Sequence, residues 1–333
     1  MSPIFKVVNV DAGPEQSLNN ENEQLRPLCV EIIRGRSDTK EKLIENVQDA
    51  DAILVAGTAI DREVLEGLDK CKVVVRYGVG VDNIDLAAAT EQGIVVAHVP
   101  DFCTEEVSTH ALALLLACGR QLRRLDAGIH SGGWFTPALP HEVKRETLGI
   151  IGIGRIGGAL ARKARPLEMN IIAYDPYLDD AVIRERGAAK VSLEELLKTS
   201  DYVSLHAPLT PETRHMIGAR ELAMMKPTAF LINTARGPEV DEAALIEALQ
   251  KGTIGGAGLD VFETEPLPAE SPLRTMENVI MTPHMAFFSP AAVSKLGVEV
   301  GRAAAAVLSG HWPKYVANPE VREKISLSAY EEP

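Results

Sequence analysis

The sequence predicts an α/β protein made of two doubly wound parallel-sheet domains, with one domain inserted into the other. Short β-branched runs alternate with stretches of helical periodicity along the chain, a pattern typical of β-α-β units. Several runs, such as VVVRY, are apolar almost throughout, as expected of strands covered by helices on both faces. The alternation falls into two sets, roughly 1–98 and 147–283.

Two strong helix patterns bracket the second set. The first is Glu105–Gly119, with Thr104 as the expected N-cap, and the second is Ala291–Leu308, preceded by Ser289 and Pro290. We therefore expect an inserted domain at 101–286 and an outer domain formed by 1–100 and 287–333. The expected strands include Ile4–Val10, Ala52–Ala56, Val73–Arg76, Val95–His98, Leu148–Ile153, Ile171–Tyr174, Tyr202–His206, Phe230–Asn233 and Val279–Met281.

Composition narrows the classes of partner. The 333 residues are enough for about two domains, with 46% hydrophobic and 24% charged residues. A net charge of −13 argues against nucleic acid and anionic membrane surfaces as partners. It does not exclude an anionic substrate, because a single arginine can hold a carboxylate. The N-terminus resembles a first strand rather than a signal peptide, and no apolar run reaches the roughly 18 residues of a membrane span. We expect a cytoplasmic protein.

The four cysteines are Cys29, Cys71, Cys103 and Cys118. They form no C-x-x-C pair and have no histidine at ligand-like spacing, so we expect no metal site. Buried free thiols in a reducing compartment are the simplest interpretation. Cys103 precedes a helix in an expected loop, and we expect it to be the most accessible of the four.

A glycine-rich turn lies at the start of the second set. GIIGIGRIGGAL supplies G-x-G-x-x-G at Gly152, Gly154 and Gly157, between an apolar strand at 148–151 and a helix at 155–165. The next strand ends at Asp175, and 175 − 157 = 18 residues is the spacing of the Rossmann dinucleotide fingerprint. This context predicts that the inserted domain binds NAD.

Each residue of this motif has a physical task. Gly152 permits a tight turn, Gly154 lets the pyrophosphate approach the backbone, and Gly157 lets the helix pack close to the strand, while Ile156 belongs to the same cofactor-contacting turn. Asp175 would accept hydrogen bonds from ribose hydroxyls and repel a 2′-phosphate, which favours NAD over NADP. Arg155 is either a neighbour of the pyrophosphate or a solvated surface residue.

Three later segments place polar residues after apolar strands: LINTARG (231–237), GLDVFETEP (258–266) and VIMTPH (279–284). Ligands sit at the carboxyl ends of strands in doubly wound sheets. A guanidinium such as Arg236 can hold the carboxylate of a 2-keto acid through paired hydrogen bonds. A histidine such as His284 can exchange a proton with the keto oxygen, and a carboxylate such as Glu265 favours its charged form. Taken one at a time, Arg236 also fits a surface ion pair, His284 a residue of a capped turn, and Glu265 a solvated glutamate.

The chain resembles the D-isomer-specific 2-hydroxyacid dehydrogenase family over nearly its whole length. The resemblance rests on RYGVGVDNIDL (76–86), ETLGIIGIGRIG (146–157), SLHAPLTPETRHMI (204–217), NTARGPEVDEAAL (233–245), GLDVFETEP and TPH (282–284). It implies that Arg236 orients the substrate, that His284 is the acid/base, and that Glu265 supports this histidine.

The resemblance also implies further contacts. Asp260 would hold the nicotinamide carboxamide, and the backbone of Val79–Gly80 would bind the substrate carboxylate. It implies a flavodoxin-like substrate domain, a Rossmann NAD-binding domain, a homodimer, and D-stereochemistry for a 2-keto or 2-hydroxy acid substrate. The remaining implied contacts are Tyr77 and Gly78 to substrate, and His206, Pro208, Thr213, Thr234, Ala235, Arg236, Asp260 and His284 to the cofactor.

Several alternatives remain open at this stage. The branch resembles 3-phosphoglycerate dehydrogenases or C-terminal-binding-protein corepressors, so an NAD(H)-sensing dimeric binding protein is the alternative to an enzyme, and a purely structural Rossmann module is a third. Phe287 and Phe288 either form an apolar substrate wall or pack between domains.

Single residues elsewhere have simpler interpretations. His206 is either a cofactor contact or structural, His110 packs within its helix, and Glu263 is solvated. Asp82, Asn83 and Asp85 fix a turn and cap a helix.

Overall fold

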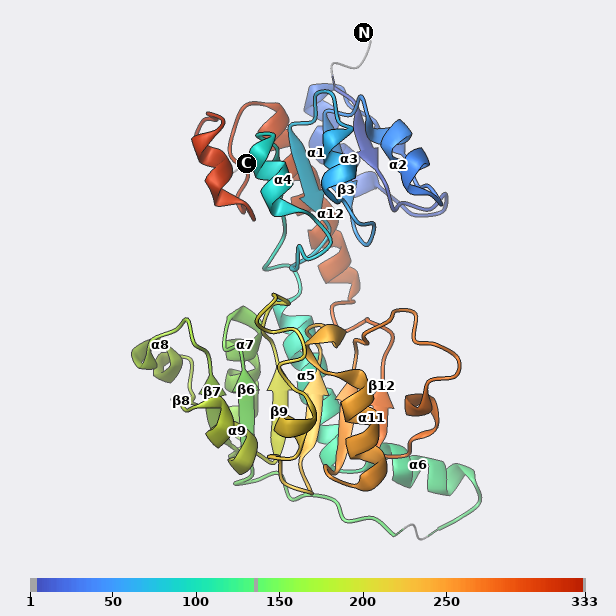
Figure 1. Ribbon diagram of the computed structural model, residues 1–333, viewed down its shortest axis with the longest axis vertical. Coiled ribbons are helices and arrows are strands. Elements are labelled where there is room, and N and C mark those ends of the chain that lie inside the picture. Colours follow the sequence, from blue (N-terminus) through green and yellow to red (C-terminus); the bar gives the residue numbers. More distant parts are fainter. Residues whose placement is uncertain (1–4, 135–136, 332–333) are drawn as a thin grey trace. The chain divides into compact units, whose positions relative to one another are not determined.

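The computed structural model describes residues 5–134 and 137–331, which form two compact units (Figure 1). The first unit runs through Phe102 and resumes at Ser289, and the second is Cys103–Phe288. The chain therefore leaves the first unit after Phe102, where we predicted residue 100, and re-enters it after Phe288, where we predicted 286.

The first unit has a five-stranded parallel sheet in the order β2-β1-β3-β4-β5. This is the flavodoxin-like order, as predicted. The strands are β1 (Val7–Asn9), β2 (Ile32–Arg34), β3 (Ala52–Val55), β4 (Val73–Arg76) and β5 (Val95–Ala97).

Helices cover both faces of this sheet. On one face, Val8, Ile53, Val74 and Val96 pack with the apolar sides of α2 (Lys40–Val47), α3 (Arg62–Glu66) and α4 (Leu86–Glu91). On the other, α12 (Pro290–Leu308) packs on β3 and β4 and against α1 (Asn19–Leu25), so the C-terminal segment completes the first unit. The single-turn helices are η1 (Arg26–Leu28), η2 (Arg165–Leu167), η3 (Gly237–Glu239), η4 (Pro272–Thr275) and η5 (Pro319–Glu323).

The second unit has a seven-stranded parallel sheet in the order β12-β11-β10-β9-β6-β7-β8. Counted from β6, this is the Rossmann order with one added strand, and the order reverses between β6 and β9. The predicted fold class is therefore confirmed. The strands are β6 (Thr147–Ile151), β7 (Asn170–Tyr174), β8 (Ala189–Lys190), β9 (Tyr202–Leu205), β10 (Phe230–Asn233), β11 (Gly256–Leu259) and β12 (Val279–Met281).

Side chains of the second sheet alternate between two cores, as the two-residue period of a strand requires. Leu148, Ile150 and Ile232 pack with α5 (Thr104–Gly119), α7 (Arg155–Ala164) and α8 (Asp180–Glu185). Ile151, Val203 and Leu231 face α9 (Leu193–Thr199), α10 (Ala219–Leu222) and α11 (Glu242–Lys251). In Figure 1, α5 lies behind this sheet and α11 in front of it. No helix within 5–134 and 137–331 is long and apolar enough to cross a bilayer.

Several local expectations need correction. Thr104 is the first residue of α5 and not its N-cap, which is Cys103. Cys103 is buried, whereas Cys29 is exposed, so the expected accessibility of Cys103 is wrong. Burial raises the pKa of Cys71 and of Cys118 to about 12.

Other local expectations hold. Ser289 caps α12 by accepting from the Ala292 N–H, and Asp85 caps α4 by accepting from the Ala88 N–H. Of the strand expected at Ile4–Val10, Ile4 lies outside the described residues, and the observed strand is Val7–Asn9.

Candidate active site

The last residues of six strands form one row across the second sheet. Strand pairing places Tyr174, Ile151, Leu205, Asn233, Leu259 and Met281 side by side in that order. Because parallel strands all run the same way, the residues that follow them leave the sheet at one edge. These following residues are Asp175, Gly152, His206, Thr234, Asp260 and Thr282. Five of the six are predicted site residues, and Thr282 is two residues before His284.

The glycine-rich turn joins β6 to α7. Gly152 has φ +82°, and a Cβ there would lie 2.7 Å from the Ala207 nitrogen, so the turn abuts the segment after β9. A Cβ at Gly157 would lie 2.3 Å from the Gly152 oxygen, which explains the close packing of α7 on the strand. Gly154 is the N-cap of α7, and a Cβ there would meet no described atom within 4 Å. The start of α7 is therefore open to an anion.

Asp175 follows β7 and is buried, with 8% of its surface exposed. Its carboxylate accepts the Ile153 N–H at 3.2 Å and the Tyr177 N–H at 3.0 Å. The acidic side chain is thus anchored to the glycine-rich turn itself. Arg155 is exposed and Ile156 is half-buried at the start of α7, and both alternatives for Arg155 stay open.

The segment after β9 is held by its own hydrogen bonds. The His206 Nε2 atom lies 2.8 Å from the Ser204 hydroxyl, and burial lowers the pKa of His206 to about 4, so its ring is neutral near pH 7. The Thr213 hydroxyl donates to the Pro208 oxygen at 2.7 Å. These bonds hold the segment together from Ser204 to Thr213.

The segment after β10 contains a buried polar atom that needs a partner. Among the described residues, none hydrogen-bonds to the Thr234 hydroxyl, although its oxygen is buried. The neighbouring backbone is satisfied, because Asn233 accepts from the Ala235 N–H at 3.0 Å and donates to the Arg236 oxygen at 2.8 Å. Buried hydroxyls are seldom left without a partner, so the Thr234 site suits a polar group of a bound molecule.

His284 and Glu265 are paired. The His284 Nδ1 atom lies 2.7 Å from Glu265 Oε2, while Glu265 Oε1 accepts the Phe262 N–H at 3.0 Å. An ionised carboxylate can only accept, so Nδ1 carries the proton and Nε2 is the atom left for proton exchange. Burial raises the pKa of Glu265, but the bonds from His284 and Phe262, together with the charges of His284 and Arg236, outweigh it and lower the pKa overall.

A buried carboxylate supports the turn that contains His284. Asp260 is 1% exposed, and it accepts the Thr282 hydroxyl at 2.5 Å and the N–H groups of Met285 and Ala286 at 2.9 and 2.8 Å. Its backbone oxygen accepts the His284 N–H at 2.7 Å, and His284 has φ +54°. Asp260 therefore fixes the position of His284, a role that the sequence did not indicate.

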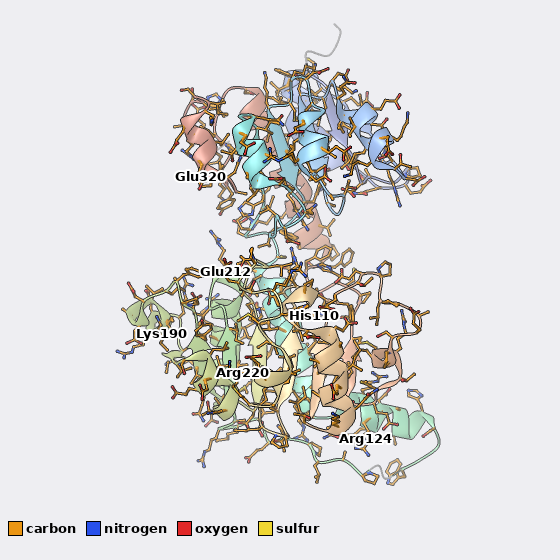
Figure 2. The ribbon with its side chains drawn as sticks, viewed as in Figure 1. His110, Arg124, Lys190, Glu212, Arg220 and Glu320 are labelled. Atoms are coloured by element: carbon orange, nitrogen blue, oxygen red, sulfur yellow. The ribbon has the colours of Figure 1, made fainter. Side chains whose placement is uncertain are left out.

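His110 belongs to the same network, so its interpretation as a helix-packing residue was incomplete. The His110 Nε2 atom of α5 (labelled in Figure 2) lies 2.9 Å from the Thr282 hydroxyl oxygen and 3.8 Å from Asp260. The Thr282 hydroxyl proton is donated to Asp260, so Nε2 of His110 is the donor to Thr282. The sequence signal was a histidine at the start of the apolar half of this helix, where a half-buried ring needs a polar partner.

The predicted substrate residues Tyr77, Gly78, Val79 and Gly80 lie in the first unit, after β4. The Tyr77 hydroxyl donates to Glu21 at 2.9 Å, and burial with the Glu21 charge raises the pKa of Tyr77. The Tyr77 side chain is thus hydrogen-bonded within the first unit. In the part of the chain that the structure describes, neither the Val79 nor the Gly80 N–H donates a hydrogen bond, so both groups can donate to an anion.

Comparison with known proteins decides the family. Residues 112–286 match the NAD binding domain of the D-isomer specific 2-hydroxyacid dehydrogenases. The chain is 41% identical over 326 residues to a glyoxylate reductase of Pyrococcus furiosus, covering 95% of this chain and 96% of that protein. The chain belongs to the D-isomer specific 2-hydroxyacid dehydrogenase family.

Two further relatives support this membership. A D-3-phosphoglycerate dehydrogenase of Methanocaldococcus jannaschii is 43% identical over 292 residues, which are 87% of this chain but only 55% of that protein. A crystal structure of D-lactate dehydrogenase from Aquifex aeolicus with NAD and lactic acid has a TM-score of 0.82 at 30% identity, covering 96% of this chain and 97% of that one. These relatives are oxidoreductases, and they lend no support to a corepressor-like binding protein.

The second unit is the NAD-binding domain, and its residues fit that cofactor. The open start of α7 suits a pyrophosphate, the anchored Asp175 carboxylate suits ribose hydroxyls, and the unsatisfied Thr234 hydroxyl lies at the same sheet edge. Within 5–134 and 137–331, no group of three or more histidine, cysteine, aspartate or glutamate side chains could hold a metal ion.

The lowered pKa of Glu265 predicts a pH-dependent contribution to stability. A carboxyl group whose pKa falls on folding stabilises the fold above its unfolded-state pKa, about 4.3, and this contribution is lost as the pH falls through the folded-state value. We expect Glu265→Gln to lower the free energy of unfolding by up to about 1 kcal/mol near pH 7, since the pair is partly exposed. Urea unfolding from pH 7 to pH 3 should show this difference vanishing toward acid. Glu270→Gln, an exposed control nearby, should show no such trend, and a pH-independent loss in E265Q would contradict the assignment.

Proposed function

We propose that this protein interconverts a small 2-keto acid and the corresponding D-2-hydroxy acid with NADH or NAD, with His284 as the acid/base. The contact between His284 and Glu265, at the sheet edge that also holds the cofactor motif, is the observation that supports this best. Family membership supports the reaction class, and the glyoxylate reductases among the relatives favour glyoxylate as the first substrate to test.

Three side chains would perform the proton and charge chemistry. The bound nicotinamide supplies or accepts the hydride. His284 would give its Nε2 proton to the keto oxygen during reduction and take it back during oxidation, while Glu265 stabilises the charged imidazole. Arg236, close enough to Glu265 to affect its pKa, would hold the substrate carboxylate and stabilise the negative charge on the reacting oxygen.

The cofactor would lie along the row of strand ends. Asp175 would hold the adenosine ribose, and the start of α7 would hold the pyrophosphate. Asp260 would contact the nicotinamide carboxamide in addition to supporting the His284 turn. The other residues that we assign to the cofactor site are Gly152, Gly154, Arg155, Ile156, Gly157, His206, Pro208, Thr213, Thr234, Ala235, Arg236 and His284.

The substrate carboxylate would also be bound by the first unit. The unused N–H groups of Val79 and Gly80 support this role, because adjacent backbone N–H groups form an anion site. Gly78, with φ +145°, shapes this loop, since a Cβ there would clash with the Arg76 guanidinium. We therefore assign substrate binding to Tyr77 (through its backbone), Gly78, Val79, Gly80, Arg236 and His284.

The activity is tested by NADH oxidation with glyoxylate, pyruvate, hydroxypyruvate and longer 2-keto acids. We expect turnover with at least one of them, and His284→Gln should lower kcat roughly 10²–10⁴-fold because the proton donor is lost. His311→Gln, a control in the first unit, should keep wild-type turnover. Failure of the wild-type protein to oxidise NADH with any of these acids would favour an NAD(H)-sensing protein instead.

Cofactor preference tests the role of Asp175. Asp175→Ala removes the negative charge that would repel a 2′-phosphate, so the ratio of kcat/KM for NADPH to that for NADH should rise about tenfold, equivalent to about 1.4 kcal/mol. Asp179→Ala removes an exposed carboxylate four residues away and should leave the ratio unchanged. An unaltered ratio in D175A would mean that the ribose is recognised elsewhere.

We also propose that the protein is a homodimer. The helix α6 (Leu122–His130) buries none of its residues, and large apolar side chains lie exposed on it and on the segment that follows, namely Leu122, Ile129, Trp134 and Leu139. Exposed apolar surface of this kind is typical of a protein interface. The double substitution Leu122→Lys with Ile129→Lys should convert a dimer into a monomer in sedimentation velocity, whereas Ile33→Lys, at an exposed residue of β2, should not. A monomeric wild-type protein would refute the proposal.

A further inference from the structure

A second histidine–glutamate pair lies next to the proposed acid/base pair. Glu263 is exposed, as expected, but its carboxylate also contacts Nε2 of His215, a contact that the sequence did not indicate. His215 lies after β9 and Glu263 after β11, with β10 between these strands in the sheet. The contact therefore spans the segment that contains Arg236.

Backbone contacts join the same three segments. The His215 N–H donates to the Pro238 oxygen at 2.8 Å, and the Ile217 N–H donates to the Glu239 oxygen at 3.1 Å. The segment after β10 in turn touches the one after β11, because a Cβ at Gly237 would lie 1.9 Å from the Phe262 carbonyl carbon. The three segments thus form one layer, and the His215–Glu263 contact connects its outer members.

The stretch Phe262–Glu265 is the part of this layer that touches His284. The Phe262 N–H is held by Glu265, and the Glu263 N–H donates to Glu242 of α11 at 3.1 Å. The Glu263 side chain is held by His215. Glu265, two residues later, supplies the oxygen that meets His284. The orientation of Glu265 therefore depends on a stretch that is fixed from α11 and from the segment after β9.

The charges of Glu242 and Glu263 indicate what the His215 ring stabilises. Burial raises the pKa of Glu242, and the charge of Glu263 raises it further, against the effect of the hydrogen bond from the Glu263 N–H. The two carboxylates therefore repel each other, which would push the stretch away from α11. The hydrogen bond that the His215 ring donates to the Glu263 carboxylate offsets this repulsion on the Glu263 side.

We propose that His215 and Glu263 form a positioning pair that holds the stretch 262–265 in place so that Glu265 meets His284. The inference rests on the proposed function of His284 and Glu265. An ordinary surface ion pair contributes little to the stability of the fold. The His215–Glu263 pair would act instead on turnover, through the orientation of the Glu265 side chain.

The first test removes each partner separately. His215 has φ +52°, which asparagine tolerates well, so His215→Asn removes the ring without straining the backbone. Glu263→Gln removes the charge and keeps the shape. Each variant should lower kcat for the best 2-keto acid about tenfold, since small misplacements of reacting groups are costly. The KM for NADH should stay within about twofold, because no residue that we assign to the cofactor site is altered.

The second test asks whether the effect passes through Glu265. His215→Asn should lower kcat about tenfold in the wild-type background but less than about twofold in the Glu265→Gln background, because the group being positioned is already lost. An equal loss in both backgrounds would mean a general structural role and would overturn the proposal. His311→Gln removes another partly exposed histidine that is paired with a glutamate, and it should leave kcat unchanged in both backgrounds.

The outcomes separate this inference from the proposed function. If Glu265→Gln and His284→Gln keep wild-type turnover, the proposed function fails, and the positioning role fails with it. If those variants lose turnover while His215→Asn and Glu263→Gln keep it, only the positioning role is wrong. Thermal unfolding followed by circular dichroism shows whether each variant folds. If His215→Asn does not fold, Glu263→Gln alone tests the positioning role.

Discussion

The pairing register of the second sheet is the constraint on which the candidate active site depends. Six parallel strands end in one row, so the first residue after each strand emerges at the same edge. A slip of one residue in any strand would reverse the faces of its side chains and move its functional residue along the edge. Packing of side chains into the two cores holds the strands in this register. It thereby brings residues more than a hundred positions apart, such as Gly152 and His284, to one edge of the sheet.

Asp260 shows how this edge tolerates a buried charge. A carboxylate that is 1% exposed is costly unless hydrogen bonds replace its lost solvation. Asp260 receives such bonds from Thr282, Met285 and Ala286, all from the segment after the neighbouring strand. The requirement to satisfy the charge thus imposes a shape on that segment. His284 lies within it and takes a left-handed backbone conformation that the bonds on either side maintain.

The sequence predicted site residues close after strong strands, because apolar runs and turn residues mark where strands end. Asp175 directly follows β7, and Arg236 and His284 are each the third residue after a strand. All three stay predicted site residues. It missed β2 (Ile32–Arg34) and β8 (Ala189–Lys190), which are short, lie at the edges of their sheets and lack long apolar runs. It also missed the contacts of His110 and His215, because their partners come from distant segments. Such contacts depend on strand order and register, which no local pattern in the chain specifies.

The proposed acid/base pair places the His284 imidazole beside a carboxylate that is close to a cation. Both oxygens of Glu265 are used, one by the Phe262 N–H and one by His284, so the carboxylate cannot rotate away without losing two bonds. Arg236 acts on the same carboxylate and helps to keep it ionised. An ionised Glu265 keeps the proton on Nδ1, so in the proposed reaction the proton exchanged with a substrate would pass through Nε2. The choice of Nε2 as the nitrogen that would exchange the proton is thus set by the residues around Glu265 as much as by His284 itself.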